Sequence, residues 1–306
     1  MRIGIVCYPT FGGSGVLATE LGMALASKGH EVHFVTYNQP VRLDFISHDL
    51  HFHEVLIEEY PLFQYQPYEL ALSTKLVDVV SKHNLEVLHV HYAIPHAYAA
   101  FMAKMMLKEK GIDIKVVTTL HGTDITLVGS HPTYKTAVEF SINNSDVVTS
   151  VSESLKQDTL RLFKITNEIK VVHNFIDTEK YDRESLNECQ RISVAKPEER
   201  ILTHISNFRP VKRIEDVIKT FYNIQKVISA KLLMVGEGPE KRKAELLVKK
   251  LGISDSVIFF GNSNEIAKIL CYTDVFLLPS KSESFGLSAL EAMAAKTAII
   301  LSLIHI

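Results

Sequence analysis

Short apolar runs alternate with longer amphipathic stretches along almost the whole sequence. A first series spans residues 3–7, 32–37, 52–57, 87–92, 116–120, 147–151 and 169–173, and a second spans residues 201–206, 232–235, 257–260, 275–278 and 298–301. Strands that alternate with helices build parallel sheets covered by helices on both faces. The polar stretch between the two series indicates a linker. The sequence therefore predicts an α/β protein with two doubly wound, Rossmann-like domains that face each other across a cleft, at residues 1–180 and 200–306, joined by a linker at residues 181–199.

Composition narrows the class of protein. The chain has 306 residues, 46% of them hydrophobic, and a formal net charge of −2, which suits two buried cores and gives no reason to expect a nucleic-acid partner. Cys7, Cys189 and Cys271 are odd in number and widely spaced, so neither a disulfide framework nor a zinc site is expected. No uncharged run approaches the roughly 20 residues of a membrane span, and the first apolar run is too short for a signal peptide. We therefore expect a cytoplasmic protein.

A glycine-rich turn follows the first predicted strand. The segment "TFGGSG" places Gly12, Gly13 and Gly15 between this strand and an amphipathic helix. Such a turn lets a ligand approach the backbone, and the free N–H groups of a helix N-terminus favour a phosphate. The glycines do not follow the dinucleotide fingerprint, and the second strand does not end on an acidic residue, so a nicotinamide cofactor is not expected. A turn needed only for packing is the alternative.

Other polar loops follow the remaining strands, where ligands of open parallel sheets bind. In the second domain "SNFRPVKR" brings the cations Arg209, Lys212 and Arg213 together directly after a strand. Guanidinium and ammonium groups can neutralise a diphosphate through bidentate and point-charge contacts. A solvated helix start without a ligand is the alternative.

The loop "PSKSESFGLSALEAM" carries two glutamates around Phe285 and Gly286. Ser284 is predicted to cap a helix that begins near these residues, so its free N–H groups would face the ligand. Glu291, about two turns into that helix, can accept hydrogen bonds from a ribose diol. Glu283, ahead of the helix, can reach the hydroxyls of a sugar. Each glutamate could also be an ordinary surface charge.

Taken together, these motifs resemble the retaining glycosyltransferases of family 4, which have the GT-B fold. The resemblance rests on the spacing of Glu283 and Glu291, on "GEGPE", on "SNFRPVKR" and on "HNFID", and it covers nearly the whole chain. The strings "CYPTFGGSGVLATELG", "HYAIPHA" and "LHGTDITLVG" are similar to the branch that joins N-acetylglucosamine from UDP-GlcNAc to L-malate in bacillithiol biosynthesis. The resemblance thus implies a hexosyltransferase whose substrates are UDP-GlcNAc and L-malate.

The resemblance also assigns roles to residues. It implies that the donor is bound by Gly12, Gly13, Gly15, Asn207, Arg209, Lys212, Phe285, Gly286, Leu287 and Glu291. His121 and Glu283 would be the catalytic residues, next to the sugar. Ser14, Tyr92, Thr119 and Thr123 lie at predicted strand ends of the first domain and are the expected acceptor contacts. His121 could alternatively be a core histidine.

The implied chemistry needs neither a metal nor a cofactor. Negative charge grows on the UDP diphosphate as the sugar–phosphate bond breaks, and Arg209, Lys212 and helix N–H groups would stabilise it. The malate hydroxyl would attack the face that UDP leaves, with a phosphate oxygen taking the proton. The pairs His51/His53 and His89/His91 each share one face of a strand, but no cysteine or carboxylate stands at a recognisable ligand spacing, so a metal site is not expected.

Alternatives to this reaction stay open. A family 4 enzyme with a lipid or sugar acceptor would use the same donor residues, and "AAFMAKMMLKEKG" is the one candidate for a membrane-facing helix, although an ordinary crossover helix explains it better. A GT-B UDP-GlcNAc epimerase is a second alternative. A homo-oligomer remains possible. The chain stops at "AKTAIILSLIHI", before the family's final elements, so the second domain is expected to be incomplete and the chain a truncated fragment.

Overall fold

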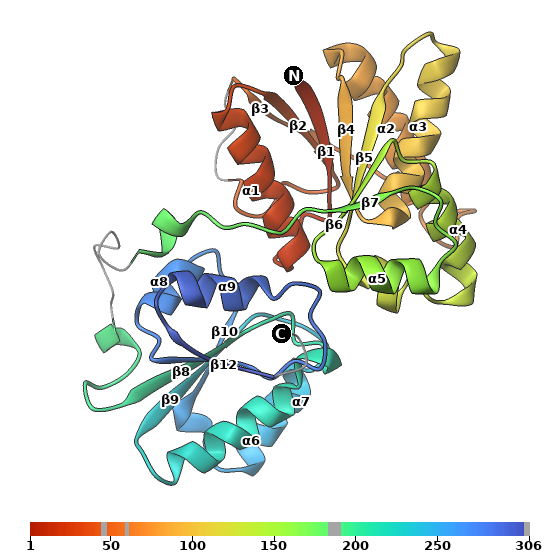
Figure 1. Cartoon of the computed structure of the whole chain (residues 1–306). Helices are drawn as coiled ribbons and strands as arrows, with labels where there is room; N and C mark the ends of the chain where they lie inside the picture. Colours follow the sequence, from red (N-terminus) through yellow and green to blue (C-terminus); the bar gives the residue numbers. More distant parts are fainter. Residues whose placement is uncertain (44–47, 59–60, 183–190, 303–306) are drawn as a thin grey trace. The chain divides into compact units, whose positions relative to one another are not determined.

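The computed structural model describes residues 1–43, 48–58, 61–182 and 191–302, and the chain divides into two compact units (Figure 1). The first unit consists of Met1–Thr10 and Ser14–Asn174, and the second of Phe11–Gly13 and Phe175–Ile306. The change of unit after Asn174 therefore comes before the polar stretch at residues 181–199. Residues 183–190 of that stretch lie outside the described residues, as do residues 303–306 at the end of the chain.

The first unit is built on one parallel sheet of seven strands in the order β3-β2-β1-β4-β5-β6-β7. Its strands are β1 (Arg2–Val6), β2 (Glu31–Thr36), β3 (Leu50–Glu54), β4 (Val87–His91), β5 (Lys115–Leu120), β6 (Val147–Ser150) and β7 (Ile169–Val171). Its helices are α1 (Gly13–Ser27), α2 (Tyr68–His83), α3 (Tyr98–Glu109), α4 (Pro132–Asn143) and α5 (Glu153–Leu162), with the short turns η1 (Ala93–Ala97) and η2 (Thr123–Leu127).

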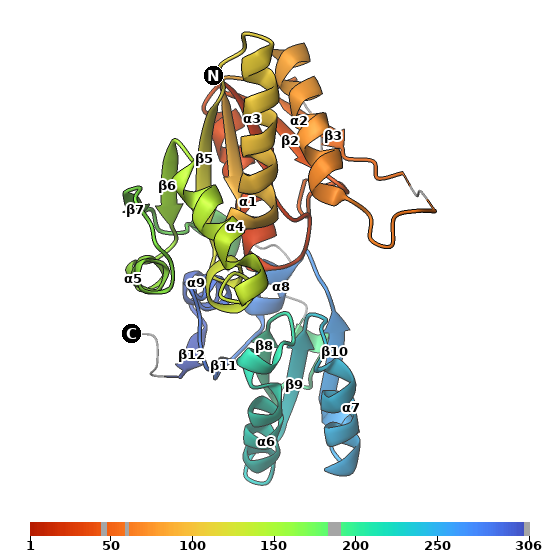
Figure 2. The same ribbon diagram turned by 90° about the vertical axis from the view of Figure 1, so that its right-hand side faces the viewer.

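Both faces of this sheet are buried because successive residues of each strand point to opposite sides. On one face Val6 and Val35 pack with Leu76 of α2 and with α3, which lies beside α2 in Figure 2. On the other face the neighbouring strand residues Ile5 and Phe34 pack with α1. This two-sided burial explains why the strands read as nearly continuous apolar runs.

The second unit has a parallel sheet of five strands in the order β10-β9-β8-β11-β12. Its strands are β8 (Arg200–Ile205), β9 (Ala230–Val235), β10 (Val257–Gly261), β11 (Val275–Leu278) and β12 (Ala298–Leu301). Its helices are α6 (Ile214–Gln225), α7 (Lys241–Lys250), α8 (Ile266–Cys271) and α9 (Leu287–Ala294), with the short turns η3 (Thr178–Tyr181), η4 (Arg191–Ser193), η5 (Pro210–Lys212) and η6 (Ser254–Ser256).

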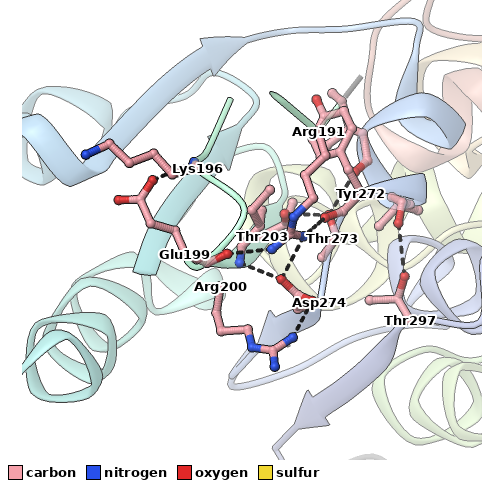
Figure 3. Close-up of polar contacts among 12 residues, drawn as sticks. Arg191, Lys196, Glu199, Arg200, Thr203, Tyr272, Thr273, Asp274 and Thr297 are labelled. Carbon is pink, nitrogen blue, oxygen red and sulfur yellow. Dashed lines mark hydrogen bonds and ion pairs between the residues drawn. The ribbon is translucent and has the colours of Figure 1, made fainter. Parts of the chain in front are cut away.

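A polar network stabilises the amino ends of β8 and β11 (Figure 3). Asp274 accepts hydrogen bonds from the backbone N–H of Ile201 at 2.7 Å and from the guanidinium of Arg191 at 3.0 Å, and it pairs with Arg200 at 3.3 Å. Burial alone would raise the pKa of this carboxyl, but these donors outweigh it and hold the pKa below its ordinary value. Arg191 also donates to the carbonyl of Tyr272, so the network connects the end of the polar stretch to the sheet.

Every strand predicted from the sequence overlaps an observed strand, and the prediction of a doubly wound α/β chain is confirmed.

The cysteines differ from expectation in one respect. Cys7 is a buried free thiol, but Cys271 is disulfide-bonded, which the odd number and wide spacing of the cysteines did not predict. Cys189 lies outside the described residues. No helix in the part of the chain that the structure describes is long and apolar enough to cross a membrane.

Candidate functional site

The strand orders locate one candidate ligand position in each unit. In the first sheet the chain proceeds outward from β1 in one direction and from β4 in the other, and in the second sheet β8 and β11 stand in the same relation. Ligands of doubly wound sheets bind beyond the carboxyl ends of the strands at such a switch point. The loops after β1, β4, β8 and β11 are therefore the candidate ligand-binding loops.

Two of the predicted acceptor residues meet at the switch point of the first unit. Ser14, from the glycine-rich turn after β1, and Tyr92, directly after β4, lie with their hydroxyl oxygens 2.6 Å apart. The ring of Tyr92 is 5.2 Å from that of His121, which follows β5. The structure thus brings together Ser14, Tyr92 and His121 from three different loops.

The glycine-rich turn is also shaped by its own packing. A Cβ atom on Gly15 would lie 2.4 Å from the carbonyl oxygen of Thr10 and 2.5 Å from that of Tyr8. No side chain fits at that distance, so Gly15 is needed for the fold of the turn whether or not a ligand is bound. Packing therefore accounts for at least part of the glycine pattern.

His121 belongs to a chain of stacked imidazoles. Its Nε2 atom is 2.8 Å from Nδ1 of the buried His91, and the two rings stack with centroids 5.0 Å apart. Burial, reinforced by the nearby His89 and His96, lowers the pKa of His121 to about 3. Its imidazole is therefore neutral near pH 7 and can exchange hydrogen bonds with a sugar or an acceptor without carrying a charge.

Asp124 belongs to this region, although it was not predicted as a site residue. Its carboxylate accepts hydrogen bonds from the backbone N–H groups of Ala93 at 2.9 Å, His121 at 3.2 Å and Gly122 at 2.9 Å. It therefore ties the loop after β4 to the loop after β5. Burial raises its pKa to about 6, and the three N–H donors only partly counter this. An aspartate directly after the turn in "HGTD" was the available signal.

The two predicted threonine contacts lie in different settings. Thr119 is 8% exposed, and its hydroxyl oxygen lies 2.8 Å from Nε2 of His89 and 2.7 Å from the hydroxyl oxygen of Thr149. This hydroxyl is thus engaged within the sheet and orients its neighbours. Thr123 stands at the start of η2 and is half-buried.

In the second unit an ion pair joins the loops after β8 and β11. The ammonium of Lys212 lies 2.6 Å from a carboxylate oxygen of Glu283, and both side chains are less than one fifth exposed. The backbone N–H of Lys281 donates to the carbonyl of Val211 in parallel with this pair. Arg209 is exposed at the start of η5, whereas Arg213 pairs with Asp216 of α6. Lys212 is thus the cation of this loop whose ion pair reaches the loop after β11.

Glu291 is buried in α9, and one of its carboxylate oxygens accepts a hydrogen bond of 2.6 Å from the hydroxyl of Tyr181. Tyr181 was expected only as the start of the linker, and its hydrogen bond to Glu291 was not predicted. The predicted cap of α9 is wrong. The residue before the helix is Gly286 with φ of 85°, and no side chain caps the helix there. A left-handed backbone favours glycine, which is why Gly286 takes the position expected for Ser284.

The glycines of "GEGPE" let two loops touch through their backbones. A Cβ atom on Gly236 would lie 1.8 Å from the carbonyl oxygen of Ser206, and one on Gly238 would lie 2.1 Å from that of Asn207. The side-chain oxygen of Asn207 is buried and has no hydrogen-bond partner among the residues that the structure describes. A buried acceptor of this kind is a suitable partner for a ligand donor.

Comparison with known protein families decides the assignment. The model of Glycosyltransferase Family 4 matches residues 11–180, and the model of glycosyl transferases group 1 matches residues 187–305. The chain belongs to glycosyltransferase family 4. This family 4 enzyme is 49% identical over 294 residues to the N-acetyl-alpha-D-glucosaminyl L-malate synthase of Bacillus anthracis, covering 96% of this chain and 76% of the relative. An uncharacterised glycosyltransferase of Methanocaldococcus jannaschii is 28% identical, with 99% of this chain and 80% of the relative covered.

Solved structures agree on the fold of this family 4 glycosyltransferase. Anabaena HepE, solved with UDP and glucose, matches with a TM-score of 0.77 and 18% identity over 98% of this chain and 80% of that one. Sucrose-phosphate synthase from Thermosynechococcus elongatus matches with a TM-score of 0.75 and 20% identity over 99% of this chain and 82% of that one. The GT-B fold expected from the sequence is confirmed.

Proposed function

We propose that this glycosyltransferase moves N-acetylglucosamine from UDP-GlcNAc to the hydroxyl of L-malate, with retention at the anomeric carbon, as the first step of bacillithiol biosynthesis in the cytoplasm. The observation that carries the choice of substrates is the 49% identity, over 96% of the chain, to an N-acetyl-alpha-D-glucosaminyl L-malate synthase. The second unit would hold the donor and the first unit the acceptor.

The groups at the switch point of the second unit suit a nucleotide sugar. Lys212 and Arg209 supply positive charge for the diphosphate, and the N–H groups at the start of α9 add their partial charge. Phe285, Gly286 and Leu287 lead into that helix. Glu291 is oriented by Tyr181 and can accept hydrogen bonds from the ribose, while the side-chain oxygen of Asn207 can accept one from the donor.

The groups of the first unit suit a small polar acceptor. The hydroxyls of Ser14 and Tyr92 can donate to a carboxylate, and neutral His121 can hydrogen-bond a hydroxyl. Thr123 would add a contact, whereas Thr119 would act through His89. The glycines of the turn after β1, of which Gly12 and Gly13 belong to the second unit and Gly15 to the first, are proposed as donor contacts on the family resemblance.

Catalysis would come from charge placement. As UDP leaves, negative charge grows on its diphosphate, and Lys212 and Arg209 stabilise that charge without requiring a divalent metal. Glu283 pairs with Lys212 at 2.6 Å and can contact the sugar. The malate hydroxyl attacks on the face that UDP leaves, its oxygen forms the new bond to the anomeric carbon, and its proton passes to a phosphate oxygen.

The test is UDP release from UDP-GlcNAc with and without acceptors. We expect release with L-malate, little release with D-malate or without an acceptor, an α-linked product, and an unchanged rate in EDTA. Equal release without an acceptor would favour a hydrolysing or epimerising enzyme. An α product only on a lipid or sugar would preserve the family and overturn malate.

The variant His121→Ala separates a role in the reaction from a role in the fold. If His121 orients the sugar or the acceptor, turnover falls while the affinity for UDP stays near that of the unaltered protein. Equal losses of turnover and UDP affinity would instead assign His121 to the core.

A further inference from the structure

A cluster of four histidines and one glutamate lies on one face of β2 and β3. Glu31 and His33 are two residues apart on β2, and His51 and His53 are two residues apart on β3. In the parallel pairing of these strands His33 stands opposite His51, so all four side chains share a face. His83, at the end of α2, completes the cluster. The roles proposed above use none of these residues.

The nitrogen and oxygen atoms of this cluster converge. Nε2 of His33 lies 3.0 Å from a carboxylate oxygen of Glu31, and Nε2 of His51 lies 3.4 Å from the same oxygen. The ligand atoms of Glu31, His33 and His51 all lie within 4.8 Å of one another. Zinc bonds of about 2.0–2.2 Å place neighbouring ligand atoms roughly 3–3.5 Å apart, so only small side-chain shifts would be needed.

We propose that Glu31, His33 and His51 form a binding site for a divalent transition-metal ion of the zinc class. The carboxylate contributes one oxygen and the two imidazoles contribute their Nε2 atoms. Glu31 and His51 are 37% and 31% exposed in their side chains, so the ion can enter from solvent and water can complete its coordination.

Two features point to a ligand and not only to packed imidazoles. Nε2 of His51 is buried and makes no hydrogen bond within the described part of the chain, although it lies 3.4 Å from a carboxylate oxygen of Glu31. His33 is fully buried, and its other ring nitrogen lies 2.9 Å from Nε2 of His53. A metal-bound histidine commonly has its second nitrogen held in this way, which fixes its tautomer and its orientation. His53 is thus a positioning residue.

The charges around the cluster favour binding of a cation on the side of His33 that faces Glu31 and His51. His33, His53 and His83 also converge, but Lys75 lies near His53 and Lys82 near His83, which disfavours a second positive charge there. On the other side Glu31 supplies a negative charge.

The site is separate from the candidate active site. Glu31 is the first residue of β2 and His51 the second of β3, so the ligands belong to the amino-end half of the strands. The residues assigned to substrates lie at or beyond the carboxyl ends of the strands. Because β3 is the edge strand of its sheet, an ion held by both strands would fasten that edge to β2. We therefore expect the metal to stabilise the fold and to leave glycosyl transfer unchanged.

The test is calorimetric titration of chelator-treated, tag-free protein with ZnCl₂. We expect one ion per chain, with affinity lowered at least 10-fold in Glu31→Gln and His51→Ala and by about 10-fold in His53→Ala. His48→Ala is the matched control, because His48 is an exposed histidine that lies 3.0 Å from Asp49 outside this cluster. It should bind zinc as the unaltered protein does.

Cobalt gives a second readout, because visible absorption bands of bound Co²⁺ should appear with the unaltered protein and weaken in Glu31→Gln. Circular dichroism checks that this partly exposed position tolerates the change. No zinc binding by the unaltered protein overturns the proposal, as does an equal loss in His48→Ala. Binding that survives Glu31→Gln and His51→Ala but disappears in His83→Ala overturns the assigned ligands. None of these binding measurements depends on which substrates the enzyme uses.

Discussion

Lys212 and Glu283 form an ion pair of 2.6 Å that joins the loops after two neighbouring strands of the second sheet. The proposed function gives these residues to different parts of the donor, the cation to the diphosphate and the carboxylate to the sugar. In the structure each neutralises the other. A donor that binds between them must therefore compete with Glu283 for the ammonium group. Mutations of the two residues should consequently have different effects on donor binding.

Removing Lys212 and removing Glu283 should affect UDP binding differently. Lys212→Ala removes the cation and should weaken UDP binding and slow transfer, by roughly 2–4 kcal/mol in transition-state stabilisation. Glu283→Gln removes the competing carboxylate, so UDP affinity should stay equal or rise while transfer is lost. Calorimetry with UDP measures the affinity. Lys219→Ala, at an exposed lysine of α6, is the control. A fall in UDP affinity with Glu283→Gln would contradict this competition.

The hydroxyl of Tyr181 should contribute measurably to stability. Tyr181→Phe removes the donor that lies 2.6 Å from buried Glu291, and hydrogen bonds to charged groups contribute about 1.5–3 kcal/mol. We expect a decrease of that size in the free energy of unfolding measured in urea, together with weaker UDP binding. Tyr222→Phe makes the same change on α6, where the ring of Tyr222 packs against Lys226, and should be nearly neutral. Equal stability of the two variants would argue against an orienting role for Tyr181.

Gly238→Ala should be much more destabilising than Gly252→Ala. Both glycines have positive φ, 154° and 69°, but a Cβ atom on Gly238 would lie 2.1 Å from the carbonyl oxygen of Asn207, whereas one on Gly252 meets nothing within 4 Å. Gly252→Ala should lower the free energy of unfolding only by the strain of a left-handed backbone, roughly 1–2 kcal/mol. The additional loss in Gly238→Ala, measured by thermal unfolding, reports the contact between the two loops. Similar losses in both variants would show that this contact can relax.

Acidification should destabilise the fold between about pH 6.5 and pH 4. Burial lowers the folded-state pKa of His89, His96 and His204 to about 4, so in this window the unfolded chain binds protons that the folded chain does not. The free energy of unfolding should then fall as the pH falls, by up to about 1.4 kcal/mol per histidine and pH unit.

Asp124 acts in the opposite direction. Its pKa is raised to about 6, so over the same range its protonation favours the folded state. These three histidines, together with His121 and His53, whose pKa values burial also lowers, outweigh this one carboxyl, so the net effect is a loss of stability. Urea midpoints from pH 7.5 to pH 4.5 measure the effect. Asp124→Asn should make the dependence on pH steeper, and a shallower dependence would show that the carboxyl does not titrate in this window.

The sequence by itself determined the order of strands and helices, because this information is local. An apolar run such as residues 32–37 must be buried on both sides, and only a parallel sheet with helices on both faces provides that environment. The positions of the loops that carry Ser14, Lys212 and Glu283 then followed from the rule that ligands bind beyond the carboxyl ends. The family motifs were likewise visible in the residues alone.

Only the tertiary structure decided which side chains meet across strands. The register of β2 and β3 places Glu31 and His33 beside His51. The spacing of residues along the chain had indicated no carboxylate that could join His51 and His53 in a metal site. The contact of Tyr181 with Glu291 spans 110 residues of sequence, so no local pattern could indicate it. Strand formation depends on neighbours along the chain, whereas these pairings depend on strand register and helix packing, which arise only when the whole sheet is assembled.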